Sequence, residues 1–177
     1  MEKIMDNQIY AHYLNDPATA PLFGKALLRD VVLTDILGAD AGNIAYWEGK
    51  QLARRFELGN VTDIALFFEQ AQLGHLTLDK QTAKEWRFTL TGLPVSARLS
   101  YTETAAPFML EAGFLAQSVE QMIGVVAETE AQDPQKNRHA DAVSLIVHLD
   151  PKDATSDPHE LNPMTLTHPD TPSAPQG

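Results

Sequence analysis

The sequence predicts an α+β domain in which helices pack on one face of an antiparallel sheet. Three helical segments come first, two alternating segments follow, and one more helix precedes a last alternating pair. Neighbouring strands joined by short loops pair antiparallel, and the alternation indicates that each strand buries one face. The predicted order is therefore α-α-α-β-β-α-β-β, a two-layer arrangement.

The first three helices are predicted from apolar residues that recur with helical spacing. Residues 22–37 are apolar on two faces and end at Gly38, a residue suited to a helix stop. Residues 41–56 carry one amphipathic stripe. Residues 62–73 have one apolar face and end at Gly74. Together these segments supply the predicted helical layer.

The strands are predicted from alternating apolar and polar residues. Residues 75–92 contain two such segments. Residues 94–101 continue the alternation, either as a third strand or as an extension past a bend at residues 92–94. Residues 125–131 alternate weakly and residues 142–150 alternate well, so a second strand pair follows the last helix.

The remaining predicted helix, residues 108–123, contains a glycine in its most apolar half. That half is apolar on nearly every side, which is typical of a helix buried on all sides. Gly113 costs about 0.5–1 kcal/mol relative to alanine in a helix interior, unless close packing compensates. Gly49 lies in a similar patch of small residues on the helix at 41–56. We expect the two helices to cross near these glycines.

Glu111 is a lone acid among apolar neighbours in the same helix, and a buried charge needs a partner. Arg29, Arg98 and Lys50 are the candidate partners. A structural ion pair or a carboxylate at the N-terminal turn, where the helix dipole favours it, is one interpretation. The other is a polar group that lines a pocket. Structural ion pairs are the commoner case.

Aromatic residues supply the other candidates for a ligand pocket. Tyr46, Trp47 and Phe114 join Glu111 as candidate lining residues. Apolar pockets are few in any protein, and aromatic residues at helical spacing more often belong to the core. The pocket is therefore a hypothesis that competes with ordinary core packing.

Composition divides the chain into three parts. Residues 1–20 form an N-terminal extension, and residues 21–150 form a single domain. Residues 151–177 carry six of the eleven prolines and few large apolar residues. Such a segment cannot bury enough surface to offset its ordering entropy, so it is expected to be disordered and to contribute nothing to the core.

Charge and missing motifs exclude several kinds of function. The net charge of −11 disfavours nucleic acid and anionic membrane surfaces. The chain has no cysteine, which excludes thiol chemistry and fits a reducing compartment. No apolar run approaches a membrane span, and no histidine spacing suggests a metal site. We expect a cytoplasmic protein without a metal or cofactor.

Three motifs resemble the YslB-like family of uncharacterised bacterial proteins, a domain-of-unknown-function family. They are LLRDVVLTDILG, IAYWEGKQLARRF and FMLEAGFLAQSVEQMIG, and the resemblance covers roughly residues 22–150. That family is grouped with 4-vinyl reductase domains, small subunits of the transport-protein particle and haem nitric-oxide sensors. The resemblance implies helices against a twisted antiparallel sheet, and dimers and buried apolar pockets occur in the group.

The chain departs from the relatives whose chemistry is known. It lacks the cysteine pair of 4-vinyl reductase domains, a cysteine that could be lipidated, and the Tyr-x-Ser-x-Arg motif of the haem sensors. The expected function is a non-enzymatic binding module for a small apolar ligand or a protein partner, as a homodimer. Two alternatives stay open: an enzyme for a small hydrophobic substrate with Glu111 as acid or base, and a scaffold subunit of an assembly.

Overall fold

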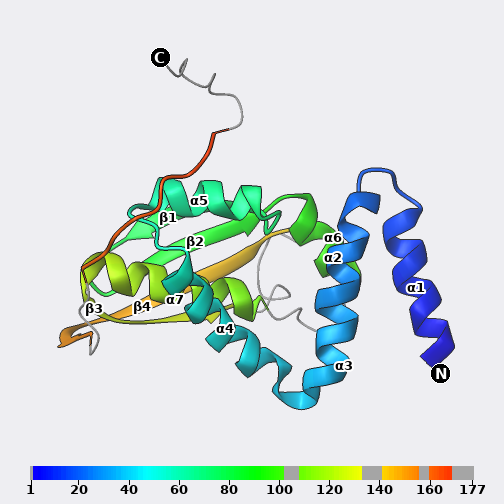
Figure 1. The fold of residues 1–177 in the computed structure, drawn as a ribbon, viewed down its shortest axis with the longest axis horizontal. Helices are drawn as coiled ribbons and strands as arrows, with labels where there is room; N and C mark the ends of the chain where they lie inside the picture. The colour runs from blue at the N-terminus through cyan, green and yellow to red at the C-terminus, as the bar shows by residue number, and fades with distance from the viewer. Residues whose placement is uncertain (1, 102–107, 133–140, 156–159, 169–177) are drawn as a thin grey trace, which may run out of the picture.

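The computed structural model describes residues 2–101, 108–132, 141–155 and 160–168 (Figure 1). Helices pack on a four-stranded antiparallel sheet, which confirms the α+β class. The predicted order of elements is present, with the additional helices α1 and α6. The elements are α1 (Glu2–Leu14), α2 (Phe23–Ala26), α3 (Leu33–Leu37), α4 (Ala41–Arg55), α5 (Val61–Gln70), β1 (His75–Gln81), β2 (Glu85–Thr91), α6 (Leu93–Tyr101), α7 (Met109–Ile123), β3 (Val125–Ala131) and β4 (Val143–Ala154).

The sheet has the strand order β1-β2-β4-β3, and every neighbouring pair is antiparallel. Alternation along β2 directs Trp86, Phe88 and Leu90 to the buried face. Phe88 lies opposite Leu145 on β4, and both belong to the main core. Most of the segment between β3 and β4 lies outside the described residues. The predicted alternating segments at residues 75–92, 125–131 and 142–150 coincide with the four strands, and β4 extends beyond its predicted segment to Ala154.

Helices α5 and α7 lie against the sheet, and α4 packs on α7 (Figure 1). Phe114 of α7 stacks on Phe67 of α5, with ring centroids 5.0 Å apart, and meets Phe68 edge-on. A second, smaller cluster joins α1 to α2 and α6 through Ile9, Tyr13, Leu22, Ala26 and Ala97. The N-terminal extension thus includes a helix whose buried side chains pack on the domain.

Helices α4 and α7 cross at Gly49 and Gly113. A Cβ atom added to Gly113 would collide with the carbonyl oxygen of Tyr46, and one added to Gly49 would collide with that of Leu110. The missing side chains therefore let the two backbones touch, and dispersion contacts offset the helix propensity that glycine loses. This is the close approach expected from the small-residue patches.

Residues 94–101 form the helix α6, so the expectation of a third strand or a strand extension was wrong. The backbone N–H groups of Val95 and Ser96 both donate to the Gly92 carbonyl, which starts the helix behind Pro94. The misleading alternation has a simple cause. Residues spaced by two also include pairs spaced by four, and Ala97 with Tyr101 fits one helix face as well as one strand face.

The tail is partly ordered, contrary to the expectation for residues 151–177. Strand β4 runs to Ala154, which pairs with Val125. Leu166 is 9% exposed and belongs to the main core. The backbone N–H of Met164 donates to the Glu57 carbonyl at 2.9 Å. Residues 156–159 and 169–177 lie outside the described residues, so the expectation of disorder stays untested there.

Candidate functional site

Glu111 lies in a buried ion pair with Arg29. The guanidinium of Arg29 donates from both terminal nitrogens to the two carboxylate oxygens, at 2.7 and 2.6 Å. Glu111 is only 1% exposed. Burial alone would raise the pKa of Glu111, but the charge and hydrogen bonds of Arg29 outweigh it and hold the pKa below its usual value. Glu111 is therefore a fixed carboxylate, and Arg29 is the partner among the three candidates.

A second ion pair lies beside the first. Arg98 of α6 donates from Nε to Asp30 at 2.9 Å, and its Nη2 lies 2.8 Å from the same carboxylate oxygen. The ring of Phe108 lies close to both arginines, with its centroid 4.8 Å from the guanidinium carbon of Arg98 and 6.0 Å from that of Arg29. We call Arg29, Asp30, Arg98 and Glu111 the ion-pair network.

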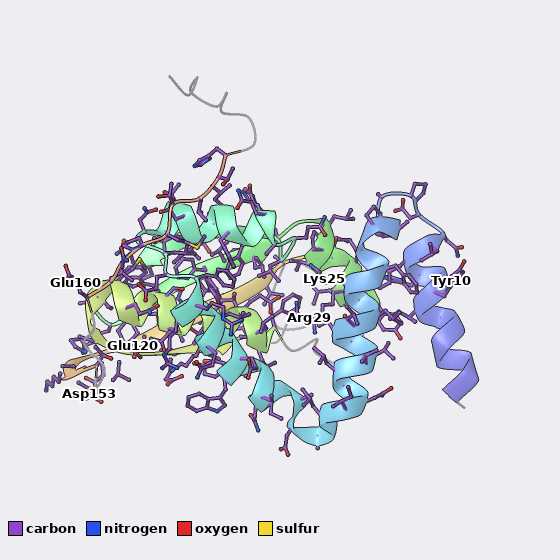
Figure 2. The ribbon with its side chains drawn as sticks, viewed as in Figure 1. Tyr10, Lys25, Arg29, Glu120, Asp153 and Glu160 are labelled. Atoms are coloured by element: carbon purple, nitrogen blue, oxygen red, sulfur yellow. The ribbon has the colours of Figure 1, made fainter. Side chains whose placement is uncertain are left out.

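The network depends on a local irregularity in the long helix that runs from α2 to α3. Residues Leu27–Val32 form a π-helical turn between α2 and α3. Such a turn has more residues per turn than an α-helix and is often found at functional sites. It lets the consecutive residues Arg29 and Asp30 both point at neighbouring helices. Figure 2 shows Lys25 and Arg29 on the side of this helix that faces the sheet and the helices packed on it.

A small chamber adjoins the network. Its volume is about 20 Å³, and Tyr13, Lys25, Arg29, Arg98 and Glu111 are among its lining residues. Burial, and then the charge of Arg29, lower the pKa of Lys25 to about 8. Burial also raises the pKa of Tyr13 to about 12. The chamber has room for about one water molecule and none for an organic substrate.

An apolar groove opens on the other side of the two arginines, between α3 and α4. Its volume is about 170 Å³, and Arg29 and Arg98 line it as well as the chamber. Apart from Glu48 and Thr34, its other walls are apolar or small. They are Leu33, Leu37, Ala41, Gly42, Ile44, Ala45 and Leu110. Unlike the chamber, the groove has space for an apolar group from outside.

Tyr46 and Lys50 lie at the edge of the sheet. The backbone N–H of Thr129 on β3 donates to the Tyr46 hydroxyl at 3.0 Å, and that hydroxyl donates to Glu128. Lys50 pairs with Glu128 at 2.7 Å. Burial, and then the hydrogen bond to Glu128, raise the pKa of Tyr46. These side chains contact the edge strand β3, and such contacts protect an edge strand from pairing with another chain.

The four candidate pocket residues do not converge on one cavity. Glu111 lines the chamber, Tyr46 bonds to β3, and Phe114 is 2% exposed within the core. Trp47 is 59% exposed on the outer side of α4. Sequence reasoning missed the groove, although the two apolar faces of residues 22–37 were a signal that one face lacked a partner.

Two further observations concern the described residues only. No helix there is both long and apolar enough to pass through a membrane. No cluster of three or more histidine or acidic side chains among them has the arrangement of a metal site.

Comparison with known proteins places the chain in a family. A family model described as "Protein of unknown function (DUF2507)" matches residues 22–148. The "Uncharacterized protein YslB" of Bacillus subtilis is 39% identical over 131 residues, which cover 74% of this chain and 86% of that protein.

Comparison with solved structures gives one fold match and one weaker alignment. A vinyl-4-reductase family protein from Methanocaldococcus jannaschii aligns with a TM-score of 0.51 at 18% identity, over 74% of this chain and 81% of that one. A trafficking protein particle complex subunit 3 from Naegleria fowleri, covalently bound to palmitic acid, aligns with a TM-score of 0.40 at 12% identity, over 85% and 97% of the two chains. The family model matches most of the chain, so this chain belongs to the DUF2507 family of proteins of unknown function.

Proposed function

We propose that this chain is a cytoplasmic, non-enzymatic binding module that takes an apolar side chain of a protein partner into the groove between α3 and α4. The size of the groove carries the proposal. A cavity of about 150 Å³ holds one benzene-sized molecule, whereas pockets for larger ligands measure about 300–1,000 Å³. At about 170 Å³, the groove fits one aromatic or branched aliphatic group.

The surface around the groove supports a protein as the occupant. Leu33 on its wall is 49% exposed, and Leu28, Val32 and Ile36 are exposed on the same long helix by 62%, 38% and 72%. Exposed apolar side chains gathered on one helix are typical of an interaction surface. A partner that inserts one side chain would cover them as well, in the manner of an anchor residue surrounded by weaker contacts.

The geometry gives less support to an enzyme. A general acid near neutral pH needs a raised carboxyl pKa, and the pKa of Glu111 is lowered instead. Both oxygens of Glu111 are held by Arg29, and the adjoining chamber has no room for a substrate. A free small apolar ligand is the second candidate, because the groove volume also suits one ring.

Photo-crosslinking tests the proposal. A photoreactive phenylalanine derivative in place of Leu33 should form an adduct with another protein in cells that express the chain naturally. The same derivative in place of Thr77, an exposed residue of β1, is the control. Thr34→Phe should fill the groove and abolish the adduct at position 33. If position 33 gives no adduct, and native mass spectrometry shows a retained small molecule, the second candidate is correct.

A further inference from the structure

Helix α4 carries an exposed stripe of residues, of which only Ile44 and Glu48 also line the groove. The stripe follows a spacing of three and four residues, which places its members on one side of the helix. We call it the α4 seam, and all of its members are exposed: Asp40, Ile44, Trp47, Glu48, Gln51, Arg54 and Arg55. Figure 1 shows α4 on the outside of the helical layer.

The centre of the α4 seam is an ordered aromatic side chain. Trp47 is 59% exposed, yet its ring meets Tyr46 edge-on with centroids 6.4 Å apart. The ammonium of Lys50 lies 5.6 Å from the centroid of the Trp47 ring, and Lys50 is itself held by Glu128. A large apolar side chain that its neighbours hold in one orientation is the kind of residue that anchors an interface.

Charges of opposite sign lie at equal distances on the two sides of Trp47. Asp40 lies seven residues before it and Arg54 seven residues after it. Arg55 adds to the basic end, whereas Glu48 lies directly after Trp47, near the centre of the seam. None of these four charges has an ion-pair partner among the described residues. The helix dipole favours this order of charges, but it gives no reason for an exposed tryptophan between them.

We infer that the α4 seam binds the same seam of a second copy, antiparallel and about a two-fold axis near Trp47. In such a two-fold interface, every contact between one residue of the first copy and another residue of the second copy occurs twice, because the two copies can be exchanged. Asp40 of each copy then faces Arg54 of the other. Trp47 and Ile44 of both copies lie at the apolar centre. Ile44 and Glu48 also line the groove, so a second copy on the seam would compete with an occupant of the groove.

Charge reversal tests the inference by sedimentation velocity of the full chain at micromolar concentrations. The wild-type chain should dimerise. Arg54→Glu with Arg55→Glu should weaken the dimer by about tenfold or more, because like charges then meet at both ends. Asp40→Arg should do the same, because it places a base opposite Arg54. Lys84→Glu with Lys152→Glu makes the same charge change as the double arginine variant at exposed residues outside the seam and should leave the dimer intact.

Mixing the two reversed variants gives the decisive result. Each alone should be monomeric, and the mixture should form a heterodimer, since every end again meets an opposite charge. Trp47→Ala should dissociate the wild-type dimer, whereas Ile36→Ala, on α3, should not. A monomeric wild-type chain, or a mixture that stays monomeric, would overturn the inference. A monomer that still gives the Leu33 adduct would leave the groove proposal standing.

Discussion

The effect of a single residue on the stability of this chain depends on the atoms that lie next to it in the structure. Gly24 and Gly113 are both helical glycines, yet a Cβ atom at Gly24 would meet nothing within 4 Å, whereas one at Gly113 would strike the backbone of Tyr46. At position 24 the glycine only lowers the helix propensity, whereas at position 113 the helix crossing requires a glycine. Substitution at the two positions should therefore change stability in opposite directions.

Gly113→Ala should lower the free energy of unfolding by about 1–3 kcal/mol or prevent folding, because the added methyl forces α4 and α7 apart. Gly24→Ala should raise it by about 0.4–1 kcal/mol. Urea denaturation of the two variants measures both effects. A higher midpoint for Gly113→Ala would contradict the account of the crossing, whatever Gly24→Ala does.

At the scale of single residues, the sequence could predict features that depend on nearby positions in the same helix. The crossing was predictable because small residues four apart on two helices mark a close approach. The partner of Glu111 was predictable only as one of three bases. The choice of Arg29 depends on the π-helical turn, which has no signature in a single sequence. The groove was also out of reach, since it depends on the spacing between α3 and α4.

At the scale of helices and strands, the wrong predictions come from sequence patterns that are compatible with two different structures. Alternation over residues 94–101 fits α6 as well as a strand, and the Gly92 turn decides between them. The proline-rich tail offered few apolar residues, but one of them, Leu166, reaches the core. Composition averages over a segment and cannot detect a single anchoring side chain.

Leu166→Ala should therefore lower the free energy of unfolding by about 2 kcal/mol or more, the lower range for a buried leucine. Met164→Ala is the matched control, because Met164 is 39% exposed and should tolerate the change. Thermal or urea unfolding of both variants gives the comparison. Equal midpoints for the two would show that the tail does not stabilise the domain, as composition alone suggested.

At the scale of the whole molecule, two cores are joined by charge as well as by packing. The sheet and α4, α5 and α7 form the larger core, and α1, α2 and α6 form the smaller one. The ion-pair network lies between them, since Arg29 and Asp30 come from the long helix and Glu111 from α7. The attachment of the smaller core should therefore depend on the charge of Glu111.

Glu111→Gln should lower the free energy of unfolding by about 3–5 kcal/mol at neutral pH, because Arg29, whose side chain is only 17% exposed, then loses its counter-charge. The folded-state pKa of Glu111 is lowered, so its ionised form stabilises the fold fully above the ordinary carboxyl value of 4.5, and that contribution is lost as the pH falls through the folded-state pKa. The difference between the wild-type chain and Glu111→Gln should therefore shrink below about pH 4.5. Glu85→Gln, which breaks the exposed pair with Arg87, should change little at any pH. Hydrogen exchange should show α1, α2 and α6 losing protection before the sheet in the Glu111→Gln chain. A difference that does not vary with pH, or simultaneous loss of protection everywhere, would mean that the network does not join the two cores electrostatically.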